Sequence, residues 1–196
     1  MSLGAPTCCS KRHDRDVESL TGSLLISNAN LFDPNFRRTV VLIGHHDEHG
    51  AVGVVLNQPL GVAVRDAVPP LGDLVEAEEP LFDGGPVEPD SVVVLADFVD
   101  PARAELLAIG SIGFLPPDAG GDIMTSIRRA RVFAGYAGWG PGQLEDELDE
   151  DSWVTVPALP GDVFHEEPVR LWDDVLRRLG RGYDMLRLMA RDPSMN

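Results

Sequence analysis

The segment from Gly135 to Glu145 has the residue types best suited to holding a ligand. Its four glycines let backbone approach backbone closely, and Tyr136 and Trp139 add flat apolar surfaces that each carry one polar tip. Pro141 starts a predicted helix with Gln143 and Glu145 in its first turn, where free amides face the glycine-rich turn. Two interpretations stay open: a ligand wedged between Trp139 and the helix start, or a packing corner that Trp139 fills.

Short polar residues beside predicted buried strands form a second group of candidates. Asn35 and Asn57, together with Asp33, could converge with the start of that helix, or they could satisfy backbone groups of nearby loops. The amides of Gly84 and Gly85 could meet an anion, although no phosphate-loop lysine follows them, or the pair could form a tight turn. The candidate ligand-binding residues are therefore Asn35, Asn57, Gly84, Gly85, Tyr136, Trp139, Gln143 and Glu145.

Other reactive residue types form no catalytic or metal-binding pattern in the sequence. His45 and His46 are adjacent at a predicted strand end, so their side chains point to opposite faces and only one can join His49. The only cysteines, Cys8 and Cys9, are neighbours near the N-terminus, and no serine lies in a nucleophile-elbow motif. We therefore predict no catalytic residue, no metal site and no cofactor, and we interpret the histidines as a polar hairpin tip.

The net charge restricts the class of partner. The chain has 16 Lys and Arg against 32 Asp and Glu, a net charge of −16, and the acidic excess falls after residue 44. Such a field repels phosphate backbones, so direct nucleic-acid binding is disfavoured unless the internal arginines cluster in space. We expect a protein partner or a small molecule instead. The internal basic clusters are Arg37, Arg38, Arg128, Arg129 and Arg131.

The apolar runs and the N-terminal residues indicate the cellular location of the protein and its division into domains. No apolar run reaches the roughly 18 residues that a membrane helix needs, and the N-terminus lacks the apolar segment of a signal peptide. The sequence therefore predicts a cytoplasmic protein with no membrane span. Residues 1–20 are predicted to form a flexible arm, and residues 21–196 are predicted to form a single domain.

Hydrophobic periodicity predicts hairpins mixed with helices. The β-branched runs at 39–43 and 51–56 flank a turn at 47–50, which predicts a hairpin covered on both faces. Such an order favours an α+β fold with a mixed or antiparallel sheet and helices packed on it. Further predicted elements are helices at 61–68, 118–131, 143–148 and 168–180 and strands at 109–114, 132–137 and 153–156.

Four blocks of the sequence resemble the AlgH/YqgE-like family of bacterial proteins. The blocks are 22–26 with 33–42, 46–59, 83–87, and 135–145 with Trp153 downstream. The resemblance implies a mixed sheet with barrel-like curvature, so we expect the sheet to be largely antiparallel and strongly curved. It also implies the label of a transcriptional regulator, given for a genetic effect on alginate production, and it implies no catalytic residue. The chain departs from the family pattern at Gln58, where Arg or Lys is common. It departs again at Gly44, where many relatives have Cys, so a redox role built on that thiol does not transfer.

Three functions are compatible with these observations, in order of preference. The first is a non-catalytic regulatory or binding protein that acts through a partner. The second is a small-molecule-binding or hydrolytic enzyme with a pocket near Gly135–Glu145. The third is direct DNA binding, which requires a face of arginines that Asp and Glu do not neutralise.

Overall fold

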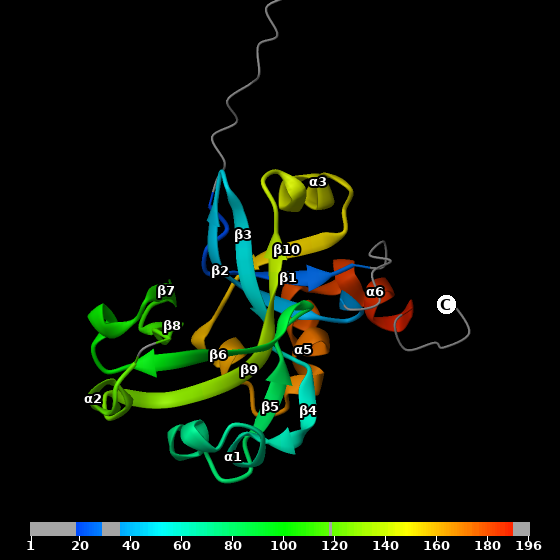
Figure 1. The fold of residues 1–196 in the computed structure, drawn as a ribbon. Helices are drawn as coiled ribbons and strands as arrows, with labels where there is room; N and C mark the ends of the chain where they lie inside the picture. Colours follow the sequence, from blue (N-terminus) through cyan, green and yellow to red (C-terminus); the bar gives the residue numbers. More distant parts are fainter. Residues whose placement is uncertain (1–18, 29–35, 118, 190–196) are drawn as a thin grey trace, which may run out of the picture.

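A computed structural model describes residues 19–28, 36–117 and 119–189, and it forms one mixed sheet with helices packed on it (Figure 1). Within these residues the sheet has ten strands. Eight follow the order β10-β1-β2-β3-β9-β6-β8-β7, while β5 pairs with β9 and β4 pairs with β5. The strands are β1 (Ser23–Ser27), β2 (Val40–Asp47), β3 (Gly50–Val55), β4 (Pro59–Ala63), β5 (Pro80–Asp83), β6 (Val87–Phe98), β7 (Leu106–Ile109), β8 (Ile112–Phe114), β9 (Ile127–Trp139) and β10 (Trp153–Pro157).

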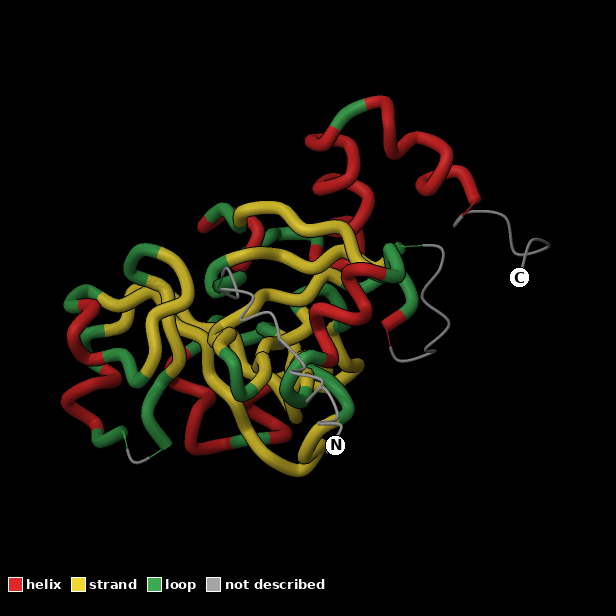
Figure 2. The backbone as a smooth tube through the Cα atoms, turned by 90° about the horizontal axis from the view of Figure 1, so that it is seen from above, coloured by secondary structure: helices red, strands yellow, loops and turns green. Residues whose placement is uncertain are grey.

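Helices are short except in the last third of the chain. The α-helices are α1 (Val64–Ala67), α2 (Gly121–Met124), α3 (Gln143–Asp149), α4 (Pro160–Val163), α5 (Leu171–Leu179) and α6 (Asp184–Met189). The 3-10 helices are η2 (Pro69–Leu74), η3 (Pro101–Arg103), η4 (Pro168–Arg170) and η5 (Arg181–Tyr183). Seen from above, α5 and α6 lie at one border of the sheet, and α6 points away from it (Figure 2).

The β2–β3 hairpin lies in the middle of the sheet, as its β-branched runs predict. A two-residue loop, Glu48 and His49, joins Asp47 to Gly50 in an antiparallel pair. The strands are buried on both faces because a helix covers one face and an aromatic cluster covers the other. A β-bulge between Ile43 and His45 then shifts the register toward the hairpin tip.

The sheet curves strongly enough to bring its far end back onto β1 and β2. A Cβ built on Gly44 of β2 would overlap the ring of Phe114 in β8. A Cβ on Gly22, just before β1, would lie 2.6 Å from the carbonyl oxygen of Ala108 in β7. These two glycines therefore allow the β7–β8 hairpin to pack closely, while the sheet stays open rather than closing into a barrel. This confirms the expected α+β fold and its largely antiparallel, curved sheet; the β5–β9 pair is parallel.

Three predicted elements are wrong. The predicted helix at 118–131 is helical only in α2, because from Ile127 onward the chain pairs with β6 as the start of the long strand β9. The predicted strand at 109–114 is instead the β7–β8 hairpin, whose turn includes Gly110 at φ 58°. The predicted helix at 61–68 begins as β4 and is helical only from Val64. In the first and third cases pairing with another strand overrides local helix propensity, whereas in the second the turn at Gly110 divides one predicted strand into two.

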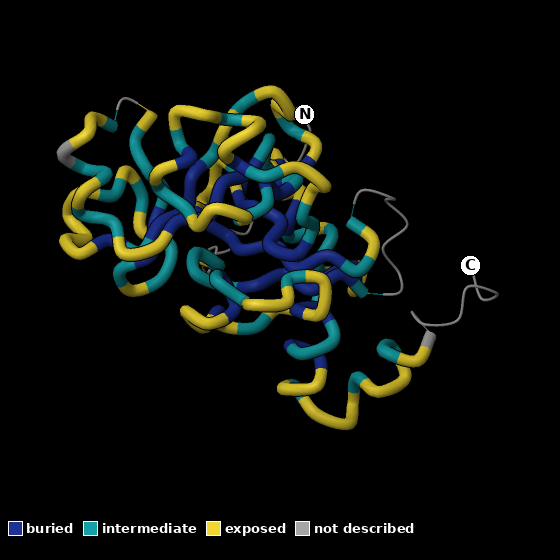
Figure 3. The backbone as a smooth tube through the Cα atoms, turned by 90° about the horizontal axis from the view of Figure 1, so that it is seen from below, coloured by how far each residue is buried: buried dark blue, intermediate teal, exposed yellow. Residues whose placement is uncertain are grey.

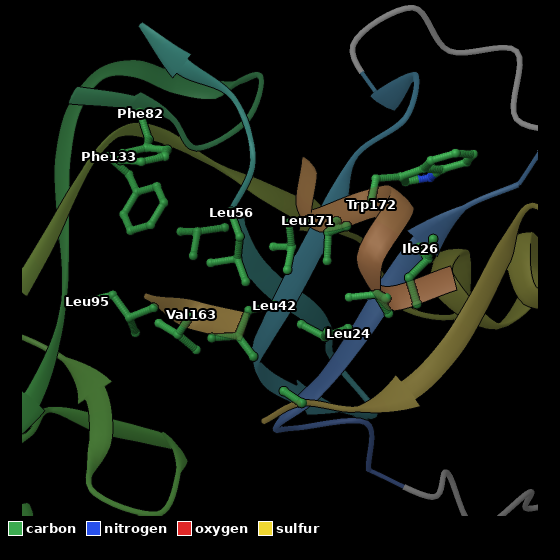
Figure 4. Close-up of a cluster of buried hydrophobic side chains, with 14 of the residues drawn as sticks. Leu24, Ile26, Leu42, Leu56, Phe82, Leu95, Phe133, Val163, Leu171 and Trp172 are labelled. Carbon is green, nitrogen blue, oxygen red and sulfur yellow. The ribbon is translucent and has the colours of Figure 1, made fainter. Parts of the chain in front are cut away.

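The main core lies between the sheet and the C-terminal helices. Figure 3 shows buried backbone concentrated in the central strands. Trp172 of α5 is 2% exposed, and its indole N–H donates to the carbonyl oxygen of Ser27 at 3.2 Å. Figure 4 shows other members of the same buried cluster, among them Leu24, Leu42, Leu56 and Leu171. Among the described residues, we find no helix with the length and apolar composition needed to cross a membrane.

Candidate functional site

An aromatic cluster joins α3 to the ends of β9 and β10. The ring centroids of Trp139 and Trp153 lie 6.1 Å apart in an edge-on arrangement. Phe36 lies 6.2 Å from Trp139 and 5.5 Å from Trp153. All three pack with Leu144, which is fully buried, in a second core on the face of the sheet opposite Trp172. The aromatic surfaces that the sequence offers to a ligand are therefore in contact with one another.

The carboxylate of Glu147 binds the polar tips of this cluster. Its Oε2 accepts the indole N–H of Trp139 at 2.9 Å and that of Trp153 at 2.7 Å. Its Oε1 accepts the side-chain amide of Gln143 at 2.9 Å. Gln143 in turn accepts the backbone N–H of Gly140 at 3.1 Å, which fixes the turn that leads into α3. One carboxylate thus satisfies two buried indole donors and links the helix to two strands.

His46 and Glu145 form the second contact between α3 and the sheet. Nδ1 of His46 accepts the backbone N–H of Leu20 at 3.1 Å, so that nitrogen carries no proton. The proton is therefore on Nε2, which donates to Oε1 of Glu145 at 2.7 Å. The imidazole is 2% exposed, and both of its nitrogens have protein partners. In this arrangement the ring orients neighbouring chain segments and has no nitrogen left to act on a substrate.

The other hairpin histidines lie apart from His46. Both His45 and His49 are exposed, whereas His46 is buried, as expected for neighbours on opposite faces of a strand. The backbone N–H of His49 and the ring of His45 hydrogen-bond to Asp47, and they hold the pKa of its carboxyl group below the ordinary value. Among the described residues, no three His, Cys, Asp or Glu side chains gather as a metal site would require.

Gly84 and Gly85 cross the backbone of β9 at very close range. Gly84 accepts the N–H of Val55 at 2.9 Å and donates to the carbonyl of Ala134 at 2.8 Å, so it bridges β3 and β9. The N–H of Gly85 donates to the side chain of Asp83 at 3.1 Å. Both amides therefore have acceptors within the protein, which favours the tight-turn interpretation over an anion site.

Asn57 connects the two strands of the central hairpin on the side away from its tip. Its Oδ1 accepts the N–H of Val40 at 2.8 Å, and its Nδ2 donates to the carbonyl of Arg38 at 2.8 Å. The side chain thus satisfies backbone groups at the start of β2, in agreement with the alternative given for it. Asn35 and Asp33 lie outside the described residues.

The candidate residues separate into three groups. Trp139, Gln143 and Glu145 meet at α3, and Asn57 lies at the start of β2. Gly84 and Gly85 contact the backbone of β9 near Tyr136. Tyr136 is three residues before Trp139, which separates the two residues by roughly 10 Å along the strand. Sequence reasoning missed Glu147 and the role of His46. A helical period places Glu147 one turn after Gln143, and this spacing was the available signal.

Two of the five internal arginines, Arg128 and Arg131, are paired with carboxylates, whereas Arg37 and Arg129 are exposed and Arg38 lies over the ring of Trp172. Arg128 pairs with Asp97 at 2.9 Å, and Arg129 lies over the ring of Phe164. The guanidinium of Arg131, in a residue 2% exposed, donates to Glu79 at 3.1 Å and to the carbonyls of Val163 and His165. Burial lowers the pKa of Arg131, and the neighbouring Glu79 opposes that shift.

A charged hollow lies where η2 meets the start of β9. Its volume is about 430 Å³, and none of the candidate residues lines it. Charged side chains dominate the lining, and carboxylates outnumber guanidiniums. These side chains are Asp73, Glu76, Glu79, Glu166, Arg128 and Arg129.

Replacing Glu147 with alanine is expected to lower the free energy of unfolding by about 3 kcal/mol, because two buried indole donors lose their acceptor. Urea denaturation followed by tryptophan fluorescence measures this loss. Glu150→Ala is the matched control, because Glu150 is exposed at the end of the same helix, and its effect is expected to stay within about 0.5 kcal/mol. Equal effects of the two substitutions would show that the indole contacts contribute no stability.

Comparisons with known proteins give one consistent result. A family model described as AlgH-like matches residues 24–184. A UPF0301 protein of Streptomyces coelicolor is 44% identical over 188 residues, covering 92% of this chain and 97% of the relative. A UPF0301 protein of Mycobacteroides abscessus is 39% identical over 181 residues, covering 89% and 87%.

Two solved structures are similar in fold. The crystal structure of protein DIP2367 from Corynebacterium diphtheriae has a TM-score of 0.73 and 33% identity, over 80% of this chain and 85% of that chain. The solution structure of the AlgH protein from Pseudomonas aeruginosa has a TM-score of 0.65 and 28% identity, over 95% of this chain and 97% of that chain.

Proposed function

The chain belongs to the AlgH-like family, and from this premise we propose that it is a non-catalytic regulatory protein that acts in the cytoplasm by binding a protein partner. One observation carries the proposal. The polar side chains of the most ligand-like segment are engaged by the protein itself: Glu147 binds two indoles, Gln143 binds the turn, and Glu145 binds His46. Groups held in this way define a backbone conformation and are not poised for acid–base or nucleophilic chemistry.

Charge supports a protein partner over nucleic acid. The net charge is −16, and Arg128 and Arg131 are each paired with a carboxylate. Affinity for nucleic acid comes largely from neutralising phosphates, and paired or buried guanidiniums contribute little to it. A role in transcription would then be exercised through another protein and not through direct contact with DNA.

We expect the purified protein to bind a pool of genomic DNA fragments with a Kd weaker than about 10⁻⁴ M at physiological salt. Fluorescence anisotropy with labelled fragments measures this binding, and a known DNA-binding protein serves as the positive control. Saturable binding below about 10⁻⁶ M, with an affinity that falls as salt rises, would contradict the proposal.

The charged hollow at η2 and β9 favours small-molecule binding as a second candidate function. Its volume of about 430 Å³ falls within the range of ligand pockets, and its excess of carboxylates suits a cationic molecule. Its lining is far more charged than that of most ligand pockets, which is why we rank this function second. Saturable binding of a small cationic molecule that Glu166→Gln weakens would favour it over the first.

A further inference from the structure

β10 forms one border of the sheet and pairs with β1 along its whole length. Five consecutive residues, Trp153–Pro157, are in register with Ser23–Ser27 without a bulge. Within the described residues, β10 is the end strand of the order, and no strand lies on its other side. The outer edge of β10 therefore presents backbone groups that no neighbouring strand satisfies.

The register shows which backbone groups point outward. The N–H of Asn28 donates to the carbonyl of Ser152, and the N–H of Ala158 donates to the carbonyl of Gly22. Hydrogen-bonded pairs alternate along an antiparallel ladder, so Val154 and Val156 also face β1. The N–H and C=O groups of Trp153 and Thr155 then face away from β1.

Pro157 occupies the next outward position of the same edge. A proline has no N–H, and in sheets it is tolerated where the N–H would face solvent, so its place agrees with this register. The accessible part of this edge therefore offers the N–H of Thr155 and the carbonyls of Thr155 and Pro157, which are both exposed residues, whereas Trp153 is 4% exposed. The side chain of Thr155 is exposed, so no bulky group of its own blocks the approach of another strand.

The other borders of the sheet are less suited to pairing. β7 packs back onto the sheet, where its Ala108 carbonyl lies against Gly22. The pairing of β4 with β5 is interrupted by a register shift between Pro59 and Ala63, and such irregular edges resist further pairing. β10 is the regular border strand.

The acidic residues that precede β10 indicate which kind of partner strand it would accept. The segment from Glu145 to Asp151, directly before β10, contains six acidic residues and no basic one. Pairing two copies of the chain through β10 would bring two such segments and two molecules of net charge −16 together, which like-charge repulsion opposes. A segment rich in lysine or arginine complements this charge.

We propose that β10 accepts an extended, basic segment of a partner protein as an added strand of the sheet. The inference rests on the proposed function and names the surface and chemistry of the partner. Main-chain hydrogen bonds to Thr155 and Pro157 provide affinity, and basic side chains near the 145–151 segment provide selectivity. Leu159, which is 49% exposed just after β10, adds an apolar contact for the incoming strand.

The test uses the full-length protein and a capped synthetic peptide of about seven residues in which lysine and valine alternate. Nuclear magnetic resonance follows the amides of β10 during the titration. We expect the amide of Thr155 to shift more than those of Val154 and Val156, with saturation below about 1 mM. A peptide with glutamate in place of lysine, and a peptide N-methylated at its interior residues, are both expected not to bind.

Thr155→Pro removes one outward N–H and is expected to weaken binding of the basic peptide about tenfold, whereas Thr155→Ala keeps that N–H and the affinity. The N-methylated peptide tests the same hydrogen bonds without altering the protein. Shifts confined to other surfaces, equal binding of the glutamate peptide, or concentration-dependent self-association through Thr155 would overturn the inference. Such a result would leave the proposed function standing, because that function fails instead through DNA binding or turnover.

Discussion

Replacing Gly135 with alanine is expected to lower the free energy of unfolding by about 4 kcal/mol or more, enough to unfold much of the protein. Gly135 has φ 69°, which an alanine adopts only with strain. Its new Cβ would also lie 2.6 Å from the carbonyl oxygen of Gly85 and 2.9 Å from that of Val87. Both neighbours are backbone atoms, one in the turn between β5 and β6 and one at the start of β6, so neither can move away cheaply.

Gly138→Ala is the matched control for this prediction. It lies in the same strand, and its new Cβ would meet side-chain atoms at 3.5 Å or more, an ordinary contact distance. We expect a loss below about 1 kcal/mol for this variant, measured by urea denaturation beside Gly135→Ala. If the two variants lose similar stability, the crossing of Gly84 and Gly85 over β9 is not the tight contact described above.

Replacing Arg131 with methionine is expected to cost about 3–5 kcal/mol of unfolding free energy. The methionine keeps the apolar stem but leaves Glu79, whose side chain is 14% exposed, without its charge partner. It also leaves the carbonyls of Val163 and His165 without their donor and removes the guanidinium that lies 4.4 Å from the ring centroid of Phe82.

Arg128→Met provides the comparison on the same strand. The Arg128 side chain is 50% exposed, and its pair with Asp97 is in contact with solvent, so we expect a loss of less than about 1 kcal/mol. Thermal and urea denaturation of both variants measure the difference. A small loss for Arg131→Met would mean that water replaces the guanidinium and that Arg131 does not hold β9 to the segment after α4.

The sequence predicts those elements of the fold whose patterns are local, and it fails where a distant strand decides the structure. The β-branched runs at 39–43 and 51–56 predicted the central hairpin, and the helical pattern at 168–180 predicted α5, because both patterns are local. The run from Ile127 to Arg131 was wrongly predicted as helix. Pairing with β6, about thirty residues earlier, decides its structure, and a single-sequence pattern does not contain that contact.

Only the part of the candidate site that lies in one continuous segment was predicted from the sequence. The segment around Trp139 and Gln143 was identified because glycine, aromatic and helix-start residues occur together in the chain. The acceptor of the Trp139 indole N–H was missed, because Glu147 meets Trp153 only after β10 returns beside β1. The spacing of Gln143 and Glu147 places the carboxylate near the indole of Trp139, but only the folded sheet brings the indole of Trp153 to the same oxygen.

The departures from the family pattern have different structural contexts. Gly44 lies under the ring of Phe114, and this contact brings β8 onto β2, so the residue has a packing role in this chain. The carbonyl of Gln58 accepts the N–H of Asp83 at 2.9 Å, a contact that depends on the backbone. Gly44 lies in β2 and Gln58 lies just before β4, so neither residue belongs to the aromatic cluster at α3.

The most direct test of the account is a turnover assay of the purified protein on a broad panel of esters, phosphoesters and nucleotides, run beside Glu145→Gln. That variant keeps an acceptor for the Nε2 proton of His46 and removes only the carboxylate charge. We predict no turnover above a mock purification for either protein, because His46, Glu145 and Glu147 hold structure. Reproducible turnover by the wild-type protein that Glu145→Gln abolishes would contradict this claim.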